Sequence, residues 1–284
     1  MLNFFKENTM ISKNKYRKLF PKKQYSLAFG TGYLSPGDET YNAVSNAIAN
    51  GYRVFDTAHY YRNESDLGKA IIDSGINREE FIIITKLSHG NKNPYYINQE
   101  FHESLGNLRT KYIDIYLIHA PKPWNDTSSD WMEKNVIAFN SILSLKESGL
   151  IKEVGVSNFE IEDLKNIFEN CIEIPKYNQI PFFIGNYNRE LIDLCRNKGI
   201  VIMSSSPLAN GKLLKNEIVI QISKEYESSP AQLCLKYLIQ KSSIPIVRSL
   251  NSLHLYENQK LNFVIDDIHM LMLDSIEDDP RVWG

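Results

Sequence analysis

The sequence predicts a single α/β domain folded as a (β/α)8 barrel, also called a TIM barrel. Within 284 residues, eight short apolar runs alternate with longer stretches of helical period. The runs are too apolar to have a face in water, which indicates parallel strands covered on both sides. Eight such units in a chain of this length favour a closed barrel. An open doubly wound sheet has less support, because no G-x-G-x-x-G follows the first run.

The eight predicted strands are the apolar runs themselves. In chain order they are "SLAFG" (26–30), "RVFD" (53–56), "FIIITK" (81–86), "IDIYLIH" (113–119), "IKEVGVS" (151–157), "KYNQI" (176–180), "IVIMS" (200–204) and "IPIV" (244–247). Apolar residues in the segments between them recur three and four positions apart, as one face of a helix requires. Examples are Ile97, Phe101, Leu105 and Leu108; Val136, Phe139 and Leu143; and Ile161, Leu164, Phe168 and Cys171. Further on, Ser229 is a predicted N-cap, with Pro230 at the first helical position.

Composition and charge exclude several classes of partner. The hydrophobic content of 43% suffices for a full core, and the formal net charge of -2 gives no reason to expect nucleic-acid or membrane binding. No window is apolar for long enough to cross a bilayer, and the N-terminus lacks the pattern of a signal peptide. Three widely spaced cysteines, Cys171, Cys195 and Cys234, predict buried thiols in a reducing compartment. We therefore expect a cytoplasmic protein that is a monomer or a weak homodimer.

The start of the chain differs from the rest in charge. Residues 1–24 contain seven Lys and Arg residues against Glu7 alone. We interpret them as a basic N-terminal extension, and as a solvated tail in preference to an interaction arm. The barrel domain is then expected over residues 25–284.

In a (β/α)8 barrel the active site lies at the C-terminal ends of the strands, and here every predicted strand ends in a polar residue. The polar residues that close the eight runs are Thr31, Asp56, Lys86, His119, Ser157 with Asn158, Gln179, Ser204 to Ser206, and Arg248 with Ser249. Any single one could be a hydrogen-bonded core residue or an ordinary loop residue. All eight together predict a functional site at this end of the barrel, which we call its mouth.

Several of these residues lie in motifs that resemble the aldo-keto reductase family. The longest, "GYRVFDTAHYYRNESDLGKAI" (51–71), contains the family pattern Gly-Tyr-Arg-x-x-Asp-Thr-Ala-x-x-Tyr-x-Asn-Glu. The others are "IITK" (83–86), "DIYLIHAP" (114–121), "GLIKEVGVSNF" (149–159), "NQI" (178–180), "SPLANGKLL" (206–214) and "EN" (257–258). They occur in the family's order, from about residue 25 to residue 263. The resemblance implies that the protein uses NAD(P)H to reduce an aldehyde or ketone to an alcohol.

Carried onto this sequence, the family's catalytic tetrad falls on Asp56, Tyr61, Lys86 and His119. Carbonyl reduction needs a hydride at carbon and a proton at oxygen, and the resemblance implies a hydride from nicotinamide and a proton from Tyr61. The Lys86 ammonium is expected to lower the pKa of the Tyr61 phenol, with Asp56 paired to Lys86. A neutral His119 can donate a hydrogen bond to the substrate oxygen.

Other residues of the longest motif have simpler interpretations. His59 and Tyr60 occupy positions that vary in the family, and we expect them to pack or to line the pocket. Arg53 is interpreted as structural. Glu64 is predicted to start the next helix, where its charge suits the helix dipole.

The resemblance also implies that NADP(H) lies across the barrel mouth. Its carboxamide is expected at Ser157, Asn158 and Gln179, which supply the donors and acceptors that a primary amide needs. The other predicted cofactor contacts are Thr31, Gly32, Asp56 and Ser205; Ser206, Leu208 and Asn210 at the pyrophosphate; and Arg248, Ser249 and Asn258 on the adenosine side.

Two parts of this predicted cofactor site depart from the family pattern. Ser205 stands where the family commonly has an aromatic residue stacked on the nicotinamide, so that stacking is lost. Leu250 and His254 stand where basic residues are usual. Arg248 is the nearest cation that could take a 2′-phosphate. We therefore expect NADPH as the cofactor, with NADH as the alternative.

The substrate is expected to be a small carbonyl compound, bound without a metal. The predicted contacts are His119 and three aromatic residues, Tyr33, Trp124 and Phe183, which favour a flat or apolar compound. The family also contains non-catalytic nicotinamide-nucleotide-binding regulatory subunits. The intact tetrad counts against this second function.

An unrelated barrel enzyme, such as a metal-dependent hydrolase, is a third hypothesis. It would require His59, His89, His102 and His119 to converge. Their distribution over strand ends and helices gives no metal-ligand spacing.

Overall fold

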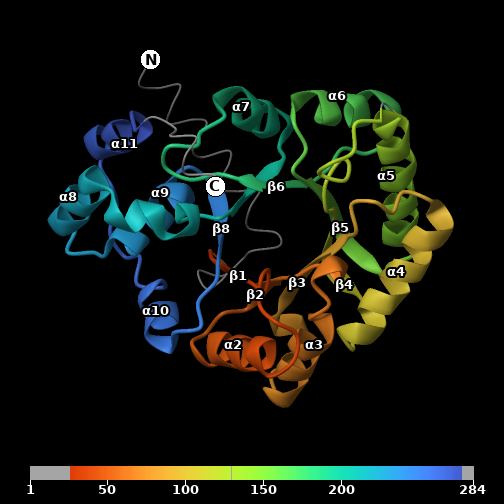
Figure 1. The fold of residues 1–284 in the computed structure, drawn as a ribbon, viewed down its shortest axis with the longest axis horizontal. Coiled ribbons are helices and arrows are strands. Elements are labelled where there is room, and N and C mark those ends of the chain that lie inside the picture. The colour runs from red at the N-terminus through yellow and green to blue at the C-terminus, as the bar shows by residue number, and fades with distance from the viewer. Residues whose placement is uncertain (1–25, 129, 277–284) are drawn as a thin grey trace.

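The computed structural model describes residues 26–128 and 130–276, and its strands close into one barrel (Figure 1). The strands are β1 (Ala28–Gly30), β2 (Val54–Asp56), β3 (Ile82–Leu87), β4 (Ile113–Ile118), β5 (Ile151–Ser157), β6 (Tyr177–Pro181), β7 (Val201–Ser205) and β8 (Ser243–Val247). Each strand is parallel to its neighbours, and β1 pairs with both β2 and β8, which closes the sheet. The predicted (β/α)8 fold is confirmed, and the predicted strand ends agree with the observed ones to within two residues.

Helices surround the barrel on its outer side (Figure 1). They are α2 (Asp38–Ala49), α3 (Glu64–Asp73), α4 (Pro94–Asn107), α5 (Trp131–Glu147), α6 (Ile161–Asn170), α7 (Arg189–Lys198), α8 (Glu217–Glu225), α9 (Pro230–Gln240), α10 (Ser252–Glu257) and α11 (Asp267–Asp274), with 3-10 turns η2 (His59–Tyr61), η3 (Arg78–Glu80) and η4 (Ala209–Lys215). Ser229 is the N-cap of α9, as predicted, because its hydroxyl accepts a hydrogen bond from the Gln232 backbone amide at 3.2 Å.

Two hydrophobic layers hold these elements together. Strand side chains such as Ile84, Ile115 and Met203 fill the inside of the barrel and are fully buried. A larger layer joins the sheet to the helices and includes Phe55 and Phe101. Most strand residues are therefore buried on both faces of the sheet, which is why the strand sequences are mainly apolar; β5 departs from this near its start, where Lys152 is exposed.

The three cysteines are free. Cys195 and Cys234 are buried, as predicted, but Cys171 is only partly buried because it follows the last residue of α6. The prediction of a buried thiol is thus wrong for Cys171.

The predicted basic extension, residues 1–24, lies outside the described residues. In the part of the chain that the structure describes, no helix is long and apolar enough to cross a membrane.

Candidate active site

The four predicted catalytic residues come together at the C-terminal end of the barrel. Asp56 ends β2, Lys86 is the next-to-last residue of β3, and His119 directly follows β4. Tyr61 is the last residue of η2, the turn that follows β2. Because β2, β3 and β4 are parallel neighbours, their ends meet at the same edge of the sheet.

Lys86 is fully buried, and its ammonium has three hydrogen bonds. Nζ donates to Asp56 Oδ1 at 2.7 Å, to Asp56 Oδ2 at 2.8 Å and to the Thr57 carbonyl oxygen at 2.9 Å. Gln179 Nε2 also donates to Asp56 Oδ2, at 2.7 Å. Burial alone would lower the pKa of Lys86, but the Asp56 carboxylate raises it above the ordinary lysine value. Lys86 is therefore a fixed cation, and its predicted pairing with Asp56 is confirmed.

The Tyr61 ring lies beside this cation. Lys86 Nζ is 5.3 Å from the centre of the ring, and Tyr61 Oη is 3.5 Å from His119 Nε2. Burial raises the pKa of Tyr61 above the ordinary tyrosine value, although the charge of Lys86 acts in the opposite direction. Lys86 thus lowers the pKa of Tyr61, as predicted, but burial outweighs this effect in the free protein. Tyr61 consequently keeps its proton at neutral pH.

His119 is a buried and neutral imidazole. Burial lowers its pKa to about 3, and the charge of Lys86 contributes in the same direction. Its Nδ1 has no hydrogen-bond partner among the described residues, whereas Nε2 faces the Tyr61 hydroxyl. With its proton on Nε2, such a ring can donate a hydrogen bond to a substrate oxygen.

Asn63 ties the turn that carries Tyr61 to the ends of β1 and β2, a function that the sequence analysis missed. Its Oδ1 accepts hydrogen bonds from the hydroxyls of Thr31 and Thr57, both at 3.1 Å. Its Nδ2 donates to the carbonyl oxygens of Thr31 at 3.0 Å and Leu34 at 3.2 Å. The available signal was a polar amide directly before a helix that is apolar on its inner face.

Glu64 starts α3 as predicted, but its carboxylate does more than complement the helix dipole. The side chain is buried, and it accepts a hydrogen bond from Thr85 Oγ1 at 2.7 Å and one from Asn107 Nδ2 at 3.3 Å. It therefore connects α3 to β3 and α4.

The residues predicted to hold a carboxamide are adjacent across the β5–β6 pair. Ser157 pairs with Gln179 in the strand register, and Ser157 Oγ donates to the Gln179 carbonyl oxygen at 3.0 Å. Asn158 adopts a left-handed backbone (φ 59), and its Nδ2 donates to Ser157 Oγ at 3.0 Å and to the His119 carbonyl oxygen at 2.9 Å. One hydroxyl and two amides thus lie close to His119 and Asp56, a donor and acceptor set that fits a primary amide.

The other predicted cofactor residues lie on neighbouring loops. The loop after β7 has left-handed backbone at Ser206, Ala209 and Asn210. Arg248, directly after β8, is exposed, and its guanidinium carbon lies 5.4 Å from the centre of the Tyr33 ring. No carboxylate of the described residues forms an ion pair with Arg248. An arginine without an acidic partner at the mouth fits a phosphate group.

The remaining residues predicted to contact the cofactor differ in burial and in hydrogen bonding. Gly32 lies against Tyr61, because a Cβ at this position would be 3.4 Å from the ring. Ser249 Oγ donates to the Asn251 carbonyl oxygen at 3.3 Å, and Asn258 is buried at the end of α10. Ser205 and Leu208 are partly buried.

The predicted substrate-binding aromatics differ in exposure. Tyr33 is 94% exposed and Trp124 is 66% exposed. Phe183 is only 2% exposed and belongs to the layer between sheet and helices. Because almost none of the Phe183 side chain is accessible to a ligand, the structure does not support its predicted role in substrate binding.

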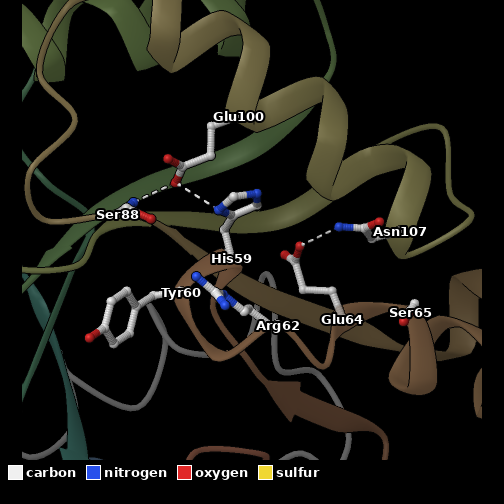
Figure 2. A pocket seen from close by; sticks show the side chains of 8 residues that line it. All are labelled: His59, Tyr60, Arg62, Glu64, Ser65, Ser88, Glu100 and Asn107. Carbon is white, nitrogen blue, oxygen red and sulfur yellow. Dashed lines mark hydrogen bonds and ion pairs between the residues drawn. The ribbon is translucent and has the colours of Figure 1, made fainter. Parts of the chain in front are cut away.

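A polar cavity of about 370 Å³ lies between the turn η2 and helix α4 (Figure 2). The residues that line it are His59, Tyr60, Arg62, Glu64, Ser65, Ser88, Glu100 and Asn107. The His59 ring points toward Glu100, with Nδ1 at 3.7 Å from Oε1, and its Nε2 lies 3.2 Å from Glu103 Oε2. His59 thus packs the turn that carries Tyr61 against α4.

Two further polar residues near His119 were not assigned from the sequence. Lys92 is buried, and its Nζ donates to the Ala120 carbonyl oxygen at 2.9 Å. Among the described residues no carboxylate lies within ion-pair distance, and burial lowers the pKa of Lys92 to about 7. His89 lies in the same loop, with its ring centre 6.3 Å from that of His119.

Fold and site together define a (β/α)8 barrel with a buried ion pair, a phenol and a neutral imidazole at its mouth. The sequence pattern of the aldo/keto reductase family matches residues 26–278. The chain belongs to the aldo/keto reductase family. Members of this family are oxidoreductases that act on carbonyl compounds and use nicotinamide cofactors.

Individual relatives agree with this assignment over most of the chain. Glyoxal reductase of Bacillus subtilis is 32% identical over 89% of this chain and 90% of its own length. The 9,11-endoperoxide prostaglandin H2 reductase of Trypanosoma cruzi is 33% identical over 91% of this chain and 89% of its own. The crystal structure of an aldo/keto reductase from Brucella melitensis has a TM-score of 0.83 at 31% identity, over 89% of this chain and 95% of that one.

Proposed function

We propose that this protein reduces a small aldehyde or ketone to the alcohol with NADPH, and that Tyr61 supplies the proton. The observation that carries the proposal is the position of the Tyr61 hydroxyl. It lies 3.5 Å from the neutral imidazole of His119, on a ring beside the buried Lys86 cation. Relatives named glyoxal reductase and prostaglandin H2 reductase support a carbonyl-type substrate.

Each side chain has a separate part in the proton transfer. A carbonyl oxygen between Tyr61 and His119 would accept one hydrogen bond from each. When bound, the cofactor supplies hydride to the carbonyl carbon. His119 then stabilises the charge that develops on oxygen, and Tyr61 donates its proton to it. The phenolate left behind is stabilised by Lys86, which Asp56 holds in place.

The cofactor is proposed to be NADPH, with NADH as the alternative. Ser157, Asn158 and Gln179 would hold the carboxamide, since they offer both donors and acceptors. Arg248 would bind the 2′-phosphate, because it is exposed and a guanidinium fork suits phosphate oxygens.

The test is NADPH oxidation at 340 nm with a panel of aldehydes and ketones, together with a fluorescence titration of NADPH. We expect binding of NADPH and turnover of at least part of the panel. NADPH binding without turnover of any compound would contradict the proposal and favour a regulatory nucleotide-binding subunit.

A further inference from the structure

The imidazole of His119 has no short hydrogen bond that would fix its position. Its Nδ1 is buried and has no partner among the described residues, and its Nε2 lies 3.5 Å from Tyr61 Oη, which is long for a hydrogen bond. The ring packs edge-on against the rings of Tyr61 and Tyr60, with centres 5.5 Å and 6.2 Å away. The position of the imidazole therefore depends strongly on the backbone that carries it.

That backbone is held at three points where the chain leaves β4. The His119 amide donates to the Leu87 carbonyl oxygen at 3.1 Å. Asn158 Nδ2 donates to the His119 carbonyl oxygen at 2.9 Å, and Lys92 Nζ donates to the Ala120 carbonyl oxygen at 2.9 Å. Asn158 follows β5 and Lys92 follows β3, the two strands that pair with β4. The two side chains thus hold the chain after β4 from opposite sides.

Helix α4 fixes the loop that carries Lys92. The buried Glu100 carboxylate accepts hydrogen bonds from the Ser88 backbone amide at 2.5 Å and from Asn91 Nδ2 at 2.8 Å. Figure 2 shows Ser88 beside Glu100, and Asn91 directly precedes Lys92. The Lys92 side chain therefore starts from an anchored backbone, and its bond to Ala120 connects this anchor to the end of β4.

Packing alone does not account for a lysine at this position. The side chain is 5% exposed, and no carboxylate in the described part of the chain forms an ion pair with it. Burial of such a group costs free energy, which an apolar side chain of similar length would avoid. What lysine adds is an N–H donor, which both the ammonium and the neutral amine provide.

We propose that Lys92 is a positioning residue for His119, which it holds in place through the Ala120 carbonyl. With this bond intact, the imidazole stays beside the Tyr61 hydroxyl, where both groups can reach one substrate oxygen. The inference rests on the proposed function, because the position of His119 affects the rate only if His119 contacts the reacting oxygen. Displacement of a reacting group by about 1 Å can lower a rate by about 100-fold.

The kinetic test is Lys92→Met, which removes the donor and keeps a side chain of similar length. We expect kcat with NADPH and the best aldehyde of the panel to fall about tenfold, while KM for the aldehyde and Kd for NADPH stay within about twofold. Lys92→Gln, which keeps an N–H donor, should recover part of the loss. Lys122→Met is the control, because Lys122 lies two residues beyond Ala120 and is exposed. Wild-type kcat in folded Lys92→Met overturns the inference.

A double-mutant cycle separates an effect through His119 from a general effect on the fold. The kcat values of Lys92→Met, His119→Gln and the double variant are compared with that of the wild type. If Lys92 acts through His119, Lys92→Met should change kcat by less than about twofold once His119 has been replaced. The same loss of about tenfold in both backgrounds would mean that Lys92 acts elsewhere, which contradicts the proposal.

An NMR measurement on the free protein keeps the two proposals separate. It follows the nuclear Overhauser effect between the ring protons of His119 and Tyr61, whose ring centres are 5.5 Å apart, and the His119 signal is identified by its absence in His119→Gln. We expect this effect to weaken in Lys92→Met and to persist in Lys122→Met. An unchanged effect in Lys92→Met overturns the inference, whether or not turnover is observed. A weakened effect without turnover of any carbonyl compound supports the role of Lys92 and contradicts only the proposed function.

Discussion

Lys86→Met would remove a cation on which the geometry of the whole site depends. In the folded protein Lys86 Nζ donates three hydrogen bonds, two of them to Asp56, and the lysine side chain is fully buried. Methionine has a similar length but no charge. The substitution leaves Asp56, which is 4% exposed, with Gln179 as its remaining side-chain donor among the described residues.

The expected cost follows from this uncompensated charge. Removing one partner of a buried ion pair destabilises a protein by about 3–5 kcal/mol, whereas replacing both partners by apolar residues is often close to neutral. Lys86→Met should therefore lower the free energy of unfolding by about 3–5 kcal/mol. The double variant Asp56→Leu with Lys86→Met should recover most of this loss.

The assay is urea unfolding followed by circular dichroism, with the free energy extrapolated to water for the wild type, both single variants and the double variant. The reasoning is refuted if Lys86→Met costs less than about 1 kcal/mol, or if the double variant loses the sum of the two single losses.

Three more predictions follow from single residues at the mouth. Arg248→Ala should weaken NADPH binding by about 1.5–3 kcal/mol and NADH binding by less, because only NADPH has the 2′-phosphate; equal losses in a fluorescence titration would exclude this contact. Trp124→Ala should change the kcat/KM ratios across an aldehyde panel without abolishing turnover, because exposed loops at this face set specificity; unchanged ratios would mean that Trp124 contacts no substrate. Wild-type stability should rise between about pH 7 and pH 8, because Lys92 loses its proton near 7 when folded and near 10.4 when unfolded, so the unfolded chain binds more protons in this window. Lys92→Met should remove that rise in pH-dependent urea unfolding, and a rise of the same size in the variant would contradict the assignment to Lys92.

The eight strands were predictable because burial on both faces leaves a mainly apolar run in the sequence. The position of Asp56, Lys86 and His119 at the mouth was predictable for a related reason, since each polar residue closes or directly follows an apolar run. Their contact then follows from the parallel pairing of β2, β3 and β4.

What the sequence does not show is how deeply a polar residue is buried. Lys92 lies in the polar segment "GNKNP", which is typical of an exposed loop, yet the folded loop buries its ammonium. The same holds for Glu64 and Tyr61. The sequence predicted a role for each residue. The buried hydrogen bonds of Glu64 and the raised pKa of Tyr61, however, depend on packing from distant segments. Phe183 was predicted to line the substrate pocket, but its ring is buried in the core instead.

The most direct test of the proposed mechanism is kcat of Tyr61→Phe, measured with NADPH and the best aldehyde of the panel. The change keeps the ring and removes the hydroxyl, so we expect kcat to fall by roughly 10²–10⁴-fold while NADPH affinity is retained. Tyr60→Phe is the matched control, because Tyr60 precedes Tyr61 on the same turn but is 60% exposed, and it should keep its activity. Full activity in Tyr61→Phe, or loss of activity in Tyr60→Phe alone, would contradict Tyr61 as the proton donor.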